Sequence, residues 1–169
     1  MENGLPQQTL LLEQILDKEN MERAWKRVRA NKGAPGIDKM TVADFPAFSQ
    51  VHIHRIIDQI REGRYAPAPV KRVWIPKPDG TKRPLGIPTV LDRVIQQAIA
   101  QVLGLLFDVG FSESSFGFRY GRAAHAAVER ISEASQEGYK WGVDCDLKGY
   151  WSSGFASFVS SLCSSERYR

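Results

Sequence analysis

Apolar residues recur every three to four positions along most of the chain, which is the spacing of one face of an α-helix. The pattern predicts helices over four segments, residues 8–31, 41–62, 89–108 and 122–137. Within the first segment, Asn20 is expected to cap a second helical stretch, because short polar side chains bond free backbone N–H groups at helix starts. The chain is therefore expected to be mainly helical.

Polar residues at the helix starts and glycines beyond the ends support these boundaries. Thr41 stands three residues ahead of Asp44, as in a capping arrangement, with an interruption near Pro46 left open. Thr89 is expected to cap the helix 89–108. That helix should face the core with Val90, Leu91, Val94, Ile95, Ala98, Ile99, Val102, Leu103 and Leu106, and water with Asp92, Arg93, Gln96, Gln97 and Gln101. The last helix should bury Ala124, Ala127, Val128, Ile131 and Ala134 and end at Gly138.

A period of two replaces the helical period in the middle of the chain. Residues 70–76 and 82–87 flank Pro78-Asp79-Gly80, whose residue types favour a tight reversal. Val73 and Ile75 should face one side and Arg72 and Trp74 the other, as in a half-buried strand. The pattern predicts a β-hairpin with Lys77 at its tip, either a solvated edge or a surface that meets a polyanion.

Two further segments carry residues that could meet a ligand. The loop 111–122 interleaves aromatic residues with arginines, which suits base stacking and phosphate contact but also an ordinary anchored loop. Residues 139–147 are expected to form a strand. Asp144 and Asp146 would share one face of it, where two carboxylates could bind Mg²⁺ or simply meet solvent.

Composition narrows the function classes. The chain has 169 residues, 43% hydrophobic and 25% charged, as in a soluble globular protein. No apolar run of about 20 residues is evident, and the N-terminal segment lacks the features of a secretion signal, so we expect a cytoplasmic protein without a membrane anchor. The net charge is +4, and residues 61–93 alone hold eight Lys/Arg against three Asp/Glu. This concentration favours nucleic acid or nucleotide phosphate as a partner.

Taken together, four blocks of the chain resemble the bacterial group II intron and retron-type reverse transcriptases. The blocks are NKGAPGID (31–38), IPKPDGTKRPLGIPTVLDRVIQQA (75–98), FSESSFGFRYGR (111–122) and VDCDL (143–147). The resemblance implies an α+β fold, with a helical fingers subdomain that carries the β-hairpin and the first strands of a right-hand polymerase palm. The fingers would span residues 1–138, the palm would start at 139–149, and 150–169 would be a divergent, frameshifted or disordered tail.

The resemblance also assigns roles to single residues. Asp146 and the carbonyl of Leu147 would bind catalytic Mg²⁺, which joins a primer 3′ hydroxyl to an incoming nucleotide on an RNA template. Lys77 and Arg83 would grip the deoxynucleoside triphosphate, and Trp151 would screen its 2′ position. Three residues would approach the template: Phe118, Arg119 and Arg122.

The chain departs from the family pattern in several places. Tyr120 stands where the family usually has proline, and Ser152 where it has an Asp. The paired aspartates of the second palm motif are absent from the sequence, so Asp146 has no partner strand. We therefore expect a truncated RNA-directed DNA polymerase that is inactive alone. The alternatives are a non-catalytic RNA-binding fingers remnant and a decayed reading frame.

Overall fold

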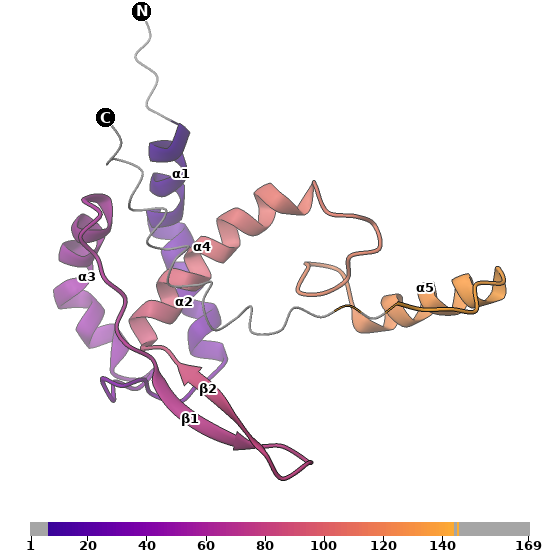
Figure 1. Ribbon diagram of the computed structural model, residues 1–169. Helices are drawn as coiled ribbons and strands as arrows, with labels where there is room; N and C mark the ends of the chain where they lie inside the picture. The colour runs from indigo at the N-terminus through magenta and orange to yellow at the C-terminus, as the bar shows by residue number, and fades with distance from the viewer. Residues whose placement is uncertain (1–6, 144, 146–169) are drawn as a thin grey trace, which may run out of the picture. The chain divides into compact units, whose positions relative to one another are not determined.

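The computed structural model describes residues 7–143 and 145 (Figure 1). The chain divides into two compact units, residues 1–109 and 110–169. The first unit contains α1 (Gln7–Leu16), α2 (Lys18–Ala30), α3 (Phe45–Arg61), β1 (Lys71–Pro76), β2 (Lys82–Ile87) and α4 (Val90–Asp108). The second contains α5 (Ala124–Gln136). The mixture of helices with a small antiparallel sheet agrees with the predicted α+β class, while the palm is not established.

Asp17, rather than Asn20, caps α2, so the predicted cap was wrong. The Oδ1 of Asp17 accepts hydrogen bonds from the backbone N–H groups of Glu19 (3.0 Å) and Asn20 (3.1 Å). The predicted helical segment 8–31 thus contains two helices, as expected, but they separate at Asp17 and not at Asn20. Asn20 lies one turn further on and points into the protein.

The buried Asn20 joins three helices. Its Nδ2 donates to the carbonyl oxygens of Ile15 in α1 (2.8 Å) and Ala98 in α4 (3.1 Å). Its Oδ1 accepts from Nε2 of Gln101 in α4 at 2.8 Å. Asn20 is only 2% exposed, so these partners replace the water it loses on folding.

Thr41 and Asp44 form the reciprocal bonds of the predicted capping arrangement, but in the turn before α3, whose N-cap is Asp44 without a side-chain cap bond. The backbone N–H of Thr41 donates to Oδ2 of Asp44 at 2.9 Å, and the backbone N–H of Asp44 donates to the Thr41 hydroxyl at 3.3 Å. The helix itself begins at Phe45, and Pro46 lies in its first turn without breaking it. A proline is tolerated there because a first-turn N–H has no partner within the helix.

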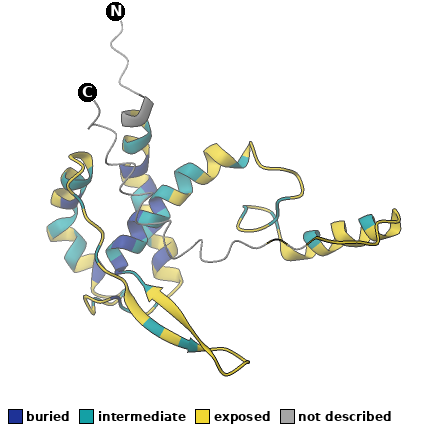
Figure 2. Cartoon of the chain, in the orientation of Figure 1, coloured by how far each residue is buried: buried dark blue, intermediate teal, exposed yellow. Residues whose placement is uncertain are grey.

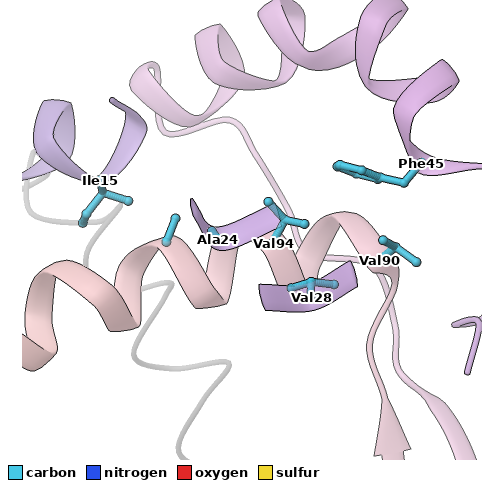
Figure 3. Close-up of a cluster of buried hydrophobic side chains, with 7 residues drawn as sticks. Ile15, Ala24, Val28, Phe45, Val90 and Val94 are labelled. Atoms are coloured by element: carbon cyan, nitrogen blue, oxygen red, sulfur yellow. The ribbon is translucent and has the colours of Figure 1, made fainter. Parts of the chain in front are cut away.

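The apolar core of the first unit gathers side chains from four helices (Figure 3). Its buried members are Ile15, Ala24, Val28, Phe45, Val90, Val94 and Ala98. The rings of Phe45 and Trp25 lie 4.7 Å apart between centroids, so α3 docks on α2 through an aromatic contact. Dark blue buried residues in Figure 2 mark this core on α1, α2 and the first part of α4.

The helix α4 is buried over its first half and exposed over its second. The Thr89 hydroxyl accepts from the backbone N–H of Asp92 at 3.1 Å, which confirms the predicted cap. Leu106, expected in the core, is 56% exposed, and its neighbours Leu105 and Phe107 are also exposed. The predicted stripe was therefore too long, because helical periodicity shows which residues share a face but not how far a neighbour covers that face.

The same helix is long and apolar enough to cross a membrane when judged by length and composition alone, and it is the one such helix in the described part of the chain. This corrects the expectation that the chain has no apolar segment of about membrane-spanning length. Core helices of soluble proteins have the same composition, and the buried first half of α4 packs against α2 in this way. The helix therefore gives no indication of a membrane protein.

The loop between α2 and α3 packs its backbone on the start of α4. A Cβ atom placed on Gly36 would lie 2.7 Å from Cα of Thr89, so only glycine allows this close approach. Nη2 of Arg93 donates to the carbonyl oxygen of Ala34 at 2.8 Å. The first block of the family resemblance, residues 31–38, thus fixes the N-terminal end of α4.

In the second unit, α5 ends at Gln136, and Gly138 follows its C-cap Glu137 with a φ of +101° that suits glycine, in agreement with the predicted stop. The predicted inward face was not found: among the described residues of α5 none is buried, and Val128 and Ile131 are exposed. The described residues 139–143 and 145 adopt no strand, contrary to prediction. A strand needs a pairing partner, and the described residues form one sheet, which β1 and β2 complete by themselves.

Candidate nucleotide and nucleic-acid interface

The predicted hairpin is confirmed. Strands β1 and β2 pair antiparallel, with Val73 opposite Leu85 and Ile75 opposite Arg83. Val73 and Ile75 are half-buried, whereas Arg72 and Trp74 are exposed, as the alternation predicted. Figure 2 shows the hairpin as a mostly exposed pair of strands.

The hairpin tip is closed by its own backbone and by Asp79. The N–H of Lys77 donates to the carbonyl oxygen of Thr81 (2.8 Å), and the N–H of Gly80 donates to that of Lys77 (3.0 Å). Gly80 has a φ of +81°. The Thr81 hydroxyl and N–H both donate to Oδ1 of Asp79, and these bonds lower the pKa of Asp79. The carboxylate therefore stays charged and keeps the turn closed at neutral pH.

Lys77 and Arg83 lie on one face of this hairpin. Arg83 is paired with Ile75, so the two side chains project to the same side. The backbone of Lys77 still pairs with Thr81, and Lys77 is two residues after Ile75, so its side chain projects to that side as well. Both side chains are exposed. In the described part of the chain neither side chain has an ion pair or a hydrogen bond, so both charges face solvent where an anion can reach them.

A buried carboxylate holds the base of the hairpin. Asp92, 3% exposed, accepts hydrogen bonds from the Tyr65 hydroxyl (2.6 Å), the Thr89 hydroxyl (2.5 Å) and the N–H of Ala68 (3.3 Å). The segment that enters β1 and the segment that leaves β2 thus meet at one side chain. Burial, and secondly the bond to Asp92, raise the pKa of Tyr65.

Sequence reasoning missed this site, because Asp92 was assigned to the water-facing side of its helix. One local pattern pointed to part of it: Asp92 stands three residues after the capping Thr89, the spacing of a reciprocal cap. The contact with Tyr65 joins residues 27 positions apart and has no local pattern.

The aromatic loop of the second unit is held by its arginines. Nη1 of Arg119 donates to the carbonyl oxygens of Ser112 (2.9 Å) and Ser115 (3.0 Å). Nη1 of Arg122 donates to the carbonyl oxygen of Glu113 at 2.9 Å, and its Nη2 forms an ion pair with the Glu113 carboxylate at 2.6 Å. Both guanidinium groups are therefore engaged within the loop, which is the arrangement expected of an anchored loop.

Phe118 lies within this loop, next to Arg119. Its ring is fully exposed, and its backbone φ is +56°, in the left-handed region that bulky residues rarely adopt. An exposed aromatic ring on an unfavourable backbone has no evident packing role. Strained residues of this kind cluster at functional sites.

The remaining residues of the predicted site, Asp146, Leu147 and Trp151, lie outside the described residues. The described residues contain no group of three His, Cys, Asp or Glu side chains that could hold a metal ion. The magnesium site therefore stays a prediction from the resemblance.

Comparisons with known proteins agree with the resemblance. A family described as reverse transcriptase (RNA-dependent DNA polymerase) matches residues 75–153. The group II intron-encoded protein LtrA of Lactococcus lactis subsp. cremoris is 40% identical over 129 residues, which cover 75% of this chain and 21% of LtrA. Protein YkfC of Escherichia coli (strain K12) is 31% identical over 147 residues, which cover 83% of this chain and 39% of YkfC.

A plant protein extends the same group: nuclear intron maturase 2, mitochondrial, of Arabidopsis thaliana is 38% identical over 56 residues, which cover 33% of this chain and 8% of that protein. The chain spans between about a fifth and two fifths of the length of the two bacterial relatives. The match to the family model begins inside β1, at Ile75, two residues before the hairpin lysine Lys77. The chain belongs to the group II intron-type reverse transcriptases, of which it contains one part.

Proposed function

We propose that this chain holds the incoming nucleotide and the RNA template for an RNA-directed DNA polymerase, which adds deoxynucleotides to a primer 3′ end. In this proposal residues 1–138 act as the fingers and 139–149 begin the palm. The observation that carries it is the shared, solvent-facing position of Lys77 and Arg83 on one face of the hairpin. A flexible ammonium and a planar guanidinium, both exposed on the same face of a hairpin, suit a triphosphate.

The proposal assigns a binding role to this part of the polymerase. Mg²⁺ would supply charge stabilisation at the reacting phosphate in this family, with Asp146 and the Leu147 carbonyl as the proposed ligands and Trp151 beside the sugar. The sequence contains no paired Asp-Asp motif that could complete this set. We place the chain in the cytoplasm, where the exposed thiol of Cys145 stays reduced.

Removing both hairpin charges tests triphosphate binding. The double variant Lys77→Ala/Arg83→Ala is expected to bind a fluorescent deoxynucleoside triphosphate at least about ten-fold more weakly, since a charge-assisted bond contributes about 1.5–3 kcal/mol. Its melting temperature should not change, because both side chains are exposed. Fluorescence titration at constant ionic strength measures the affinity.

The control variant is Lys26→Ala/Arg29→Ala, which removes one Lys and one Arg from the exposed surface of α2. It should change the triphosphate affinity by less than about two-fold, since it loses the same net charge at another place. Equal losses in the two double variants would mean that net charge alone attracts the triphosphate, and the proposed site would be wrong.

The aromatic loop is proposed to contact the template through Phe118, with Arg119 and Arg122 holding the loop that presents it. Phe118→Gly is expected to weaken binding of a 12-nucleotide oligouridylate about 5- to 150-fold, the loss of one stacked base. Phe118→Tyr should keep the affinity. Because glycine accepts the φ of +56°, Phe118→Gly should not lower the melting temperature.

Fluorescence anisotropy with labelled RNA and a thermal melt together decide this case. An affinity of Phe118→Gly within two-fold of the parent protein would remove the loop from the template site. The variant Arg119→Ala/Arg122→Ala should lower the melting temperature, because it frees the carbonyl oxygens of Ser112, Ser115 and Glu113.

A further inference from the structure

The hairpin has a second face, opposite to Lys77 and Arg83. The pairing places Arg72 opposite Gly86, Trp74 opposite Pro84, and Pro76 opposite Lys82. Because paired residues of an antiparallel hairpin project to the same side, these side chains share one surface. We call it the Trp74 face, with the members Arg72, Trp74, Pro76, Lys82 and Pro84.

Trp74 lies in the middle of this face and is 55% exposed. In the described part of the chain its ring makes no aromatic contact and lies under no cation. Two prolines share this face with it: Pro84 lies opposite Trp74, and Pro76 lies two residues further along β1. The ring and the two prolines form an exposed apolar surface with charged residues at its edge, which is typical of an interaction site.

The charge on this face has one sign. Arg72 and Lys82 lie on the two sides of Trp74 along the hairpin, four residues apart in register, or roughly 13 Å. Neither strand contains an acidic residue, and the Asp79 carboxylate in the turn is engaged by Thr81. In the described residues no ion pair or hydrogen bond occupies either cation. The face therefore combines an exposed stacking surface with two free positive charges.

We propose that the Trp74 face binds single-stranded RNA, with a base stacked on Trp74 and phosphates at Arg72 and Lys82. An aromatic ring between cations is the combination that single strands bind without sequence preference, through stacking and backbone charge. The choice of RNA as the polymer rests on the proposed function. The hairpin then has two binding faces, one for a nucleotide and one for a strand.

Variants of the full chain test the two parts separately. With a labelled 12-nucleotide oligouridylate, Trp74→Ala is expected to lower the affinity about 5- to 150-fold without changing its salt dependence, since no charge is removed. Trp74→Phe should retain most of the affinity. Arg72→Ala/Lys82→Ala should flatten the slope of log affinity against log salt by about 1.4, or about 0.7 for each phosphate that is no longer neutralised.

Triphosphate binding shows whether the hairpin is intact in these variants. If Trp74→Ala loses RNA affinity but binds the triphosphate normally, the proposal is supported. If Trp74→Ala loses both because the hairpin unfolds, the slope of Arg72→Ala/Lys82→Ala decides, and an unchanged slope overturns the proposal. RNA affinity within two-fold of the parent protein in Trp74→Ala also overturns it.

The outcome for the proposed function stays distinguishable. It depends on the loss of triphosphate binding in Lys77→Ala/Arg83→Ala, a variant that leaves the Trp74 face unchanged. If Trp74→Ala keeps its RNA affinity while Lys77→Ala/Arg83→Ala loses triphosphate binding, only this inference is contradicted. If Trp74→Ala loses RNA affinity while Lys77→Ala/Arg83→Ala still binds the triphosphate, only the proposed nucleotide site is contradicted.

Discussion

Asp92→Ala is expected to destabilise the first unit by about 2–4 kcal/mol, because it leaves buried donors without a partner. The Tyr65 hydroxyl, the Thr89 hydroxyl and the N–H of Ala68 all donate to this one carboxylate. Such a loss is a large share of the roughly 5–15 kcal/mol that typically stabilises a domain. Denaturant unfolding followed by circular dichroism measures it.

A matched control is Glu22→Ala, which removes an exposed carboxylate from α2 and should change the free energy of unfolding by no more than about 0.5 kcal/mol. Tyr65→Phe removes one of the three donors and should cost about 1–2 kcal/mol in the parent protein but less in the Asp92→Ala background. Additive losses would show that the two side chains do not interact in solution.

Because of Tyr65, we also expect the free energy of unfolding to depend on pH in the alkaline range. Because the pKa of Tyr65 is raised in the folded state, its neutral form stabilises the fold fully below the unfolded pKa of about 10. That contribution is lost as the pH rises above this value. Tyr65→Phe should lack this part of the alkaline destabilisation, so its stability should approach that of the parent protein at high pH.

Asn20→Asp is expected to destabilise the first unit by about 3–5 kcal/mol at pH ~8, since it places an unpaired charge in the core. The side-chain nitrogen of Asn20 donates to the carbonyl oxygens of Ile15 and Ala98. A carboxylate oxygen at that position would face two acceptors and have no proton to offer. Chemical unfolding at two pH values is the measurement.

The loss should shrink as the pH falls. Burial and the two carbonyl oxygens would raise the pKa of the introduced carboxyl, and the protonated form can donate to one of them. Asn31→Asp, at the exposed C-terminal end of α2, is the control, with an expected effect of about 0.3–1 kcal/mol from the helix dipole. Similar losses in the two variants would show that Asn20 does not join the helices as described.

Local patterns predicted the parts of this fold that depend on near neighbours. The hairpin followed from alternation and from Pro78-Asp79-Gly80, and the cap at Thr89 followed from its residue type. Asn20 was predicted as a helix cap and Asp92 as a solvent-exposed residue, because the sequence near a polar residue does not show the distant segment that brings it a buried partner. Their partners, Ala98 and Tyr65, lie 78 and 27 residues away.

The functional residues divide in the same way. The exposed position of Lys77 and Arg83 on one face could be deduced from strand alternation. The bonds of Arg119 and Arg122 to carbonyl oxygens could not, because composition alone does not distinguish a cation that waits for phosphate from one that holds a loop. The strand expected over 139–147 failed in its described part because pairing depends on other strands, which the residues themselves do not specify.

The position of Asp92 also bears on the order in which the chain folds. Its contact with Tyr65 closes a loop of 27 residues, which is entropically unfavourable when the loop is formed from a flexible chain. The hairpin lies inside that loop, and hairpins form locally within about 1–10 μs. Once Lys71 pairs with Ile87, the two ends to be joined are already near each other, and each halving of the free loop saves about 0.6 kcal/mol. We therefore expect β1 and β2 to pair before Tyr65 reaches Asp92, so that the strands act as the nucleus and the buried carboxylate locks them in place afterwards.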